Sequence, residues 1–212
     1  MLEEEKIKKG ILFCPGDDAL RAIKLRAHNL CFEFNRLMED DYEKRAAIIA
    51  ELFGRPLENG FLQGPIYIHY GIHTKIGKNF FGNFNLTIQD DAEVKIGDDC
   101  NFGPGVTIVT PVHPMLPDER RFVMTASGEK KHMCYAKPVS IGNDCWFGAN
   151  VTVCPGVTIG DGVVIGAASV VTRDIPPGVF AAGSPCRVIR KITEDDSLVN
   201  KPEILADNRV IK

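Results

Sequence analysis

The sequence predicts a mainly β protein, a parallel β-helix built from hexapeptide repeats. The first observation is an apolar residue at every sixth position from Ile141 to Val171, and the second is a glycine directly after most of these positions. A period of six fits neither an amphipathic helix nor a simple strand. It fits a chain that turns a corner every six residues and stacks on itself. The apolar positions are Ile141, Phe147, Val153, Ile159, Ile165 and Val171.

The composition bounds the class of protein. A chain of 212 residues suggests one domain or one domain with an appendage, and a net charge of −3 is too slight for a nucleic-acid or anionic-membrane binder. No apolar run has membrane-spanning length and the start is acidic, so we expect no membrane partner, no signal peptide and a cytoplasmic protein. Seven cysteines without CxxC spacing indicate small apolar fillers, with Cys100 and Cys145 in repeat slots.

Residues 17–53, ahead of the repeats, read as a helical hairpin with an apolar stripe at three- and four-residue spacing. We expect this segment, residues 1–60, to pack on the solenoid and cover its open end, because the last coil would otherwise expose unpaired backbone groups. The expected helix caps are Asp17 or Asp18 and then Asp40 or Asp41, and Gly54-Arg55-Pro56 ends the second helix.

The β-helix domain is expected over residues 61–192. Its early register is less clean: Ile66 and Ile72 are six apart, and Gly82 is a weak apolar position. The pattern stops at residue 111 and resumes after 138, and a loop of this length thrown out of a regular scaffold is a place to look for a site. The tail, residues 193–212, reads as a short helix or a partly disordered segment.

His113 is the first candidate for chemistry. It lies five residues past Ile108, where the long loop leaves the scaffold. Histidine is the side chain best matched to proton transfer near neutral pH, and a base held between a rigid coil and a loop is well oriented. An ordinary surface histidine is the alternative reading. The spacing of the histidines does not indicate a zinc site, so we expect no metal.

Asn83 and Asp91 are further candidates. An amide donates to an oxyanion, and a carboxylate accepts from a sugar hydroxyl. Both residues are also ordinary at the corners of a coil, and this reading stays open. Trp146, the only tryptophan, follows a small residue in its repeat and should point outward, toward a ligand or a neighbouring subunit.

Positive charge gathers near the end of the repeats. Arg173, Arg187, Arg190 and Lys191 are opposed only by Asp174 between positions 173 and 191. Arginine suits phosphate, so this surplus suggests an anionic ligand. A solvated basic strip is the alternative.

Several segments closely resemble the hexapeptide-repeat acetyltransferases, with the maltose, galactoside and nodulation-type sugar O-acetyltransferases as near relatives. The resemblance implies a left-handed parallel β-helix, a homotrimer with sites between neighbouring subunits, and transfer of an acetyl group from acetyl-CoA to a hydroxyl. The segments that carry it are Gly10–Phe13, Phe32–Asn35, Asn79–Asn85, His113-Pro114, Ile141–Val151, Pro155–Gly160, Ile165–Pro176 and Ala182–Arg190.

The resemblance also implies residue roles. His113 falls on the catalytic histidine, Asn83 on the asparagine that supports the oxyanion and contacts the acceptor, and Asp91 on an acceptor-binding aspartate. No covalent enzyme intermediate is implied. The positions matching coenzyme A contacts are Trp146, Ala149, Ala167, Thr172, Arg173, Arg187 and Arg190.

The acceptor side departs from the family. Cys14-Pro15 stand where an aspartate is usual, with Asp17 just downstream, and His69 stands where galactoside enzymes carry a serine. We expect Asp17 and His69 to contact the acceptor. A sugar such as maltose, glucose or a galactoside is the expected acceptor. Serine, an antibiotic hydroxyl or an amino sugar is the alternative within the enzyme class, and a non-catalytic trimeric binding scaffold is the alternative outside it.

Overall fold

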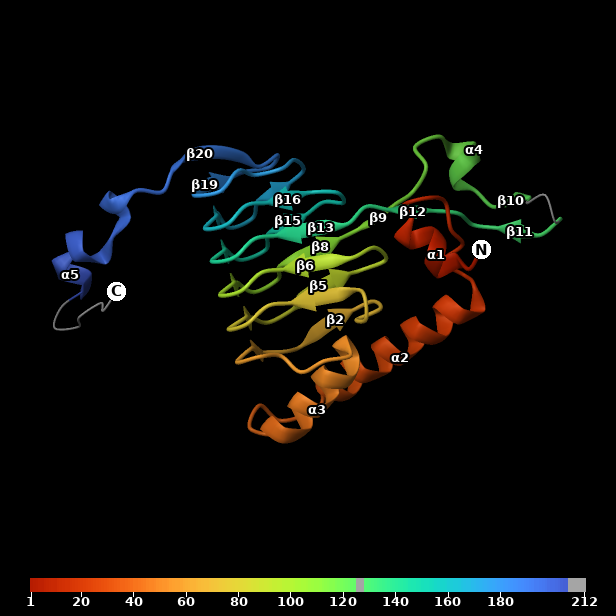
Figure 1. Ribbon diagram of the computed structural model, residues 1–212, viewed down its shortest axis with the longest axis horizontal. Helices are drawn as coiled ribbons and strands as arrows, with labels where there is room; N and C mark the ends of the chain where they lie inside the picture. The colour runs from red at the N-terminus through yellow and green to blue at the C-terminus, as the bar shows by residue number, and fades with distance from the viewer. Residues whose placement is uncertain (125–127, 206–212) are drawn as a thin grey trace.

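The structure is a computed structural model that describes residues 1–124 and 128–205. It confirms the predicted class: stacked parallel coils form a mainly β solenoid, with helices at one end and an arm leaving its side (Figure 1). Each coil contributes one short strand to each of three sheets. The solenoid is therefore three-sided, and its chain turns corners and stacks on itself as the period of six predicted.

The sheets are named here by their outer strands. The β1–β20 sheet has the order β1-β4-β7-β14-β17-β19-β20, the β2–β18 sheet the order β18-β15-β8-β5-β2, and the β3–β16 sheet the order β16-β13-β6-β3. All neighbours in them run parallel except β19 and β20. The first sheet comprises β1 Phe61–Leu62, β4 Phe81–Gly82, β7 Asn101–Phe102, β14 Trp146–Phe147, β17 Val164–Ile165, β19 Val179–Ala182 and β20 Arg187–Lys191. The second comprises β2 Ile66–Ile68, β5 Leu86–Gln89, β8 Thr107–Val109, β15 Thr152–Val153 and β18 Val170–Val171. The third comprises β3 Thr74–Ile76, β6 Val94–Ile96, β13 Val139–Ile141 and β16 Thr158–Ile159.

The interior of the solenoid is a ladder of apolar side chains. Phe102 packs edge-on against Phe147, with ring centroids 4.4 Å apart. The six predicted apolar positions from Ile141 to Val171 are all buried, and so are the small fillers Cys100 and Cys145. Burial of this kind is the main force that holds the coils together.

One predicted interior position is wrong. Ile72 is 40% exposed, because it lies in the turn after β2. The interior instead continues from Ile68 to Thr74 and Ile76, so this coil is longer at one corner. Gly82 is buried, and its missing side chain leaves room for Leu62, which a Cβ at Gly82 would approach to 2.6 Å.

Two helices, α2 Asp18–Phe34 and α3 Tyr42–Phe53, form the helical hairpin. Asp17 caps α2 and accepts hydrogen bonds from the backbone N–H groups of the first turn. Asp41 occupies the N-cap of α3 without a side-chain cap bond, and Gly54 ends α3 with φ 69°. A further short helix, α1 Glu3–Lys8, was not expected.

The hairpin lies across the first coil (Figure 1). Asn35 bonds both backbone groups of Ile66 through its side-chain amide. The guanidinium of Arg45 donates to the carbonyl oxygen of Leu62 at 2.7 Å. These contacts satisfy edge groups that the solenoid would otherwise expose.

Residues 111–124 and 128–138 form an arm. At its root β9 Pro111–Val112 pairs antiparallel with β12 Tyr135–Ala136, and nearer the tip β10 Val123–Met124 pairs with β11 Lys130–Lys131. A short helix, α4 Pro117–Arg120, lies between β9 and β10. Phe13 bonds the backbone of Cys134 in both directions, at 2.8 and 3.0 Å. The N-terminal segment thus holds the arm against the solenoid.

The described tail comprises η1 Glu194–Asp196, η2 Leu198–Asn200 and α5 Pro202–Leu205, and it leads away from the solenoid (Figure 1). None of the helices in the described ranges has the length and apolar character needed to cross a bilayer.

Candidate functional site

Three of the candidate residues, His69, Asp91 and His113, share one corner of the solenoid, between the β2–β18 sheet and the β3–β16 sheet. Eight residues separate Ile68 from Ile76, and eight separate Ile88 from Ile96, where only six separate Val153 from Ile159. In the next coil the arm leaves the solenoid at the same corner, between β8 and β13. The segments with the extra residues include His69, Asp91 and His113. They lie one above another, because backbone hydrogen bonds join each coil to the next here. We call this the long corner.

A buried pair of carboxyl groups forms the middle of the long corner. Asp90 accepts hydrogen bonds from the backbone N–H groups of Tyr70 at 2.7 Å and Gly71 at 2.9 Å, and from the hydroxyl of Thr74 at 2.8 Å. Asp91 is only 2% exposed, and within the described chain its Oδ2 has no hydrogen-bond partner. Burial, followed by the charge of Asp90, raises the pKa of Asp91 to about 6.

The hydroxyl of Tyr70 is a second buried polar atom without a partner in the described part of the chain. Burial and then the charge of Asp91 raise its pKa. Tyr70 was not singled out in the sequence, because a tyrosine in a turn carries no pattern of its own. Together Tyr70 and Asp91 leave hydrogen-bonding capacity unused at the long corner, as a ligand site requires.

His113 lies directly after β9, at the root of the arm, and is exposed. Its ring centroid is 5.1 Å from that of His132, and His132 in turn lies 5.6 Å from Phe122. The arm therefore folds back so that His132 contacts the candidate base. No sequence pattern indicates this contact, since His113 and His132 are 19 positions apart and lie outside the sixfold repeat.

Asn83 lies at the other end of the β2–β18 sheet. It follows β4 and precedes β5, whereas Asp91 and His113 follow the far ends of β5 and β8. A four-residue strand spans about 13 Å. One chain therefore does not bring Asn83 and His113 together.

The candidate coenzyme A residues fall in three places. Trp146 is 57% exposed on β14, which confirms that it points outward, and Ala149 and Ala167 stack at the corner that also carries Asn83. Gly148 is needed there, because a Cβ would lie 2.6 Å from the backbone nitrogen of Ala167. Thr172 and Arg173 are exposed directly after β18, at the far end of that sheet.

Arg187 and Arg190 lie on β20. Arg187 donates to the carbonyl oxygen of Cys186 at 2.8 Å, and both terminal nitrogens of Arg190 donate to the carboxylate of Asp196, at 2.7 and 2.8 Å. Those bonds to Arg190 lower the pKa of Asp196 to about 2. A phosphate at Arg190 would therefore compete with a carboxylate of the chain's own tail.

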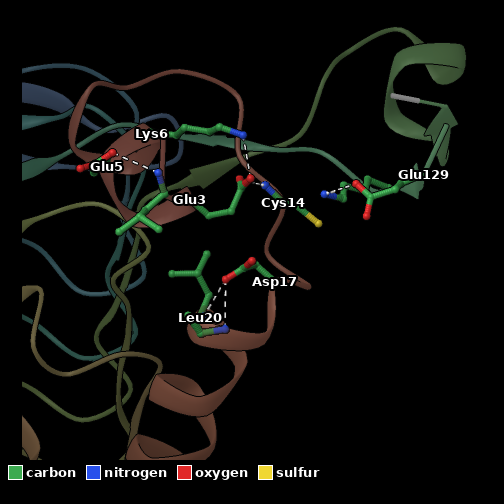
Figure 2. A network of polar contacts seen from close by, with 10 residues as sticks. Glu3, Glu5, Lys6, Cys14, Asp17, Leu20 and Glu129 are labelled. Atoms are coloured by element: carbon green, nitrogen blue, oxygen red, sulfur yellow. Dashed lines mark hydrogen bonds and ion pairs between the residues drawn. The ribbon is translucent and has the colours of Figure 1, made fainter. Parts of the chain in front are cut away.

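Asp17 caps α2 and lines a pocket of about 630 Å³ between the N-terminal segment and the arm, together with Lys24 and His132. Figure 2 shows Cys14 between Glu3, which accepts its backbone N–H, and the arm that carries Glu129. This bond ties the segment just before Asp17 to α1, and the backbone bonds of Phe13 with Cys134 tie it to the arm.

His69 lines a second pocket, of about 440 Å³, between α2 and the outer faces of β2 and β5. Its Nδ1 lies 3.1 Å from Nε2 of His28 on α2. His28 was missed in the sequence, because nothing in the helical pattern pairs it with a residue 41 positions away. In the described chain, no three His, Cys, Asp or Glu side chains gather as metal ligands would.

Two family models match the chain: the maltose acetyltransferase hexapeptide capping motif over residues 6–56, and the hexapeptide repeat of succinyl-transferase over residues 138–173. The galactoside O-acetyltransferase of Escherichia coli is 45% identical over 192 residues, which are 91% of this chain and 90% of that protein. The galactoside O-acetyltransferase of Lactococcus lactis is 39% identical over 87% of this chain and 86% of its own.

Solved structures agree with these relatives. A maltose O-acetyltransferase from Clostridium difficile has a TM-score of 0.84 at 40% identity, covering 92% of this chain and 99% of its own. A galactoside acetyltransferase in complex with coenzyme A has a TM-score of 0.83 at 42% identity, with both chains fully covered. With its coils, its capping segment and nearly its full length matched, the chain belongs to the hexapeptide-repeat acetyltransferase family, in its maltose and galactoside O-acetyltransferase branch.

Proposed function

We propose that the protein transfers an acetyl group from acetyl-CoA to a hydroxyl of a sugar. The observation that carries this proposal is the 45% identity with a galactoside O-acetyltransferase over nine-tenths of both chains. The related galactoside acetyltransferase with coenzyme A bound supports acetyl-CoA as the donor. The free thiols of all seven cysteines and the use of acetyl-CoA also fit a cytoplasmic enzyme.

His113 is the general base in this proposal. It takes the proton of the bound sugar hydroxyl while that oxygen attacks the thioester carbonyl, and it returns the proton to the departing thiolate. Asn83 donates to the oxyanion that develops on the carbonyl oxygen. General-base help contributes about 10² to 10⁴ in rate, and an oxyanion donor about 10² to 10³.

The assembly is a homotrimer with each site between two subunits. The separation of Asn83 and His113 along one sheet supports this, because a second copy is needed to set one beside the other. The exposed Trp146 supports it as well, since a large aromatic side chain on a flat face commonly meets a ligand or a neighbour. Sedimentation equilibrium tests the assembly directly: a single species of three chains is expected, and a monomer that turns over would contradict the shared site.

The acceptor side carries the remaining residues. Asp91 lies in the long corner, His69 lines the pocket beside it, and Asp17 lines the pocket beside the arm. Trp146, Ala149, Ala167, Thr172, Arg173, Arg187 and Arg190 hold coenzyme A in this proposal.

Mass spectrometry of acceptors incubated with acetyl-CoA tests the reaction. The panel holds maltose, glucose, a methyl galactoside, glucosamine and serine, and release of free coenzyme A is followed in parallel. A mass gain of one acetyl group on a sugar is expected, with His113→Ala slower by about 10³-fold in kcat at unchanged affinity for coenzyme A. Transfer to serine or to an amine alone would instead support a non-sugar acceptor, and no transfer to any of them would favour a binding scaffold.

A further inference from the structure

The pair formed by His28 and His69 joins the helical hairpin to the long corner. His28 Nε2 and His69 Nδ1 are 3.1 Å apart, and the ring centroids are 5.2 Å apart. In such a pair one ring nitrogen donates its proton and the other accepts it, so the proton's place on one ring determines its place on the other.

The surroundings keep both rings neutral. Burial, followed by the Lys24 and His28 charges, lowers the pKa of His69 to about 4, and burial and Lys24 lower the pKa of His28. Lys24 itself donates from Nζ to the carbonyl oxygen of Pro15 at 2.6 Å. At neutral pH the pair is therefore a hydrogen-bonding element without charge, beside one ammonium group.

The pair lies on a coil below the one from which the arm with the candidate base leaves. His69 stacks below Gln89 and Val109, since its N–H donates to the carbonyl oxygen of Ile88 and successive coils pair in register. Two coil spacings are about 10 Å, so the pair lies about two coils below the root of the arm. The rest of the pocket is lined by aromatic and polar side chains. They are Phe32 on α2 and Asn35 at its C-cap, and Tyr67, Thr87 and Gln89 on the outer face of the sheet.

We propose that His28 is a positioning residue that fixes the tautomer and ring orientation of His69, so that Nε2 of His69 presents one defined hydrogen-bonding group to the acceptor. This inference rests on the proposed function and deepens it. Because Nδ1 is engaged by His28, Nε2 is the nitrogen left for a ligand. A neutral hydroxyl-rich acceptor fits this pocket, whereas the nearby Lys24 ammonium disfavours the cationic amine of an amino sugar.

Kinetics with a neutral sugar acceptor test the role of His28. His28→Phe is expected to raise the acceptor KM by about two- to tenfold, the effect of one lost hydrogen bond, with kcat and the KM for acetyl-CoA unchanged. His28→Gln, whose amide both donates and accepts, should restore most of the loss. Asn29→Ala, one residue along the exposed side of α2, is the matched control and should leave every constant unchanged.

A double-mutant cycle separates positioning from packing. If His28 acts through His69, then His28→Phe has no further effect on the acceptor KM in a His69→Phe background. Additive effects of the two substitutions would overturn the proposal, and so would equal losses in His28→Phe and His28→Gln.

Long-range proton–nitrogen NMR of the histidine-labelled protein gives a readout that needs no turnover. A single His69 tautomer is expected between pH 6 and 8 in the unaltered protein, and a mixture of tautomers in His28→Phe. An unchanged His69 spectrum in His28→Phe would overturn the role of His28. A failure of all acetyl transfer by the unaltered enzyme would overturn the proposed function alone, and the NMR result would still decide the His28 proposal.

Discussion

Asn35 completes the first coil as a further strand would, because its side-chain amide bonds Ile66 twice. Nδ2 donates to the Ile66 carbonyl oxygen at 2.9 Å, and Oδ1 accepts the Ile66 N–H at 2.7 Å. Asn35 is also the C-cap of α2, so the end of the helix and the edge of the solenoid are joined at one residue. The helical hairpin is thus part of the sheet's hydrogen bonding and not only an apolar cover.

Replacing Asn35 by Leu should lower the free energy of unfolding by about 2 kcal/mol, because two backbone groups of Ile66 lose their partners. Urea unfolding at a fixed protein concentration measures it. Asn29→Leu, on the exposed side of the same helix, is the control and should change stability little. Equal losses in both variants would mean that the two bonds from Asn35 to Ile66 do not set the effect.

Gly148→Ala should destabilise the solenoid by about 1 to 3 kcal/mol, since the new Cβ would lie 2.6 Å from the backbone nitrogen of Ala167 and the stacked coils must separate. Thermal unfolding measures the loss. Gly16→Ala is the matched control, because the nearest atom to its Cβ would be 3.8 Å away. A Gly148→Ala protein as stable as Gly16→Ala would show that the corner opens without cost.

The sequence predicted the interior positions of the upper coils without exception and missed one in the lower coils, for a physical reason. From Ile141 onward each side of the coil takes six residues, so interior positions repeat strictly and pattern alone identifies them. Below the arm the long corner takes extra residues, and a count of six then places Ile72 inside when it is 40% exposed.

The proposed site rests in part on sequence. His113 is a candidate from the sequence alone because the pattern breaks beside it. The contacts of His113 with His132 and of His69 with His28 join segments with no common periodicity, so only the fold reveals them. Likewise, the pairing of Arg190 with Asp196 depends on a turn in the tail that no repeat specifies.

Asp196→Ala should lower the KM for acetyl-CoA by a few-fold, because the guanidinium of Arg190 would no longer be occupied by a carboxylate when a phosphate approaches. The effect should shrink in high salt, which screens exposed charges. Asp195→Ala removes the adjacent charge without touching Arg190 and should change the KM less. A raised KM in Asp196→Ala would mean instead that Asp196 orients Arg190 for its ligand.

Trp146 should report the binding of coenzyme A. It is the only tryptophan and is 57% exposed, so a ligand that covers it should change its fluorescence. Titration with coenzyme A is expected to give a saturable change, and Trp146→Ala to weaken binding by about tenfold in calorimetry. Binding seen by calorimetry with no change in fluorescence would place the cofactor elsewhere.

Asp91→Asn should stabilise the protein at neutral pH while weakening acceptor binding. Burial raises the pKa of Asp91 to about 6 from an ordinary value of 3.8, so the native state prefers the protonated form. Below about pH 4 both the folded and unfolded chains are protonated and Asp91 costs nothing. Between about pH 4 and 6 the unfolded chain ionises while the native carboxyl stays protonated, so the cost grows across this window and levels off above pH 6 at an order of 3 kcal/mol.

Asp91→Asn should therefore have nearly the stability of the unaltered protein near pH 4 and a higher stability at pH 7. Its acceptor KM should be raised. Asp90→Asn is the matched control and should lower the stability instead. The Asp90 carboxylate accepts three hydrogen bonds, and the amide nitrogen of an asparagine would face those donors. Unfolding at both pH values, together with acceptor kinetics, measures the difference. If Asp91→Asn lost stability at pH 7, the carboxylate would be satisfied in the native state and would not be held ready for a ligand.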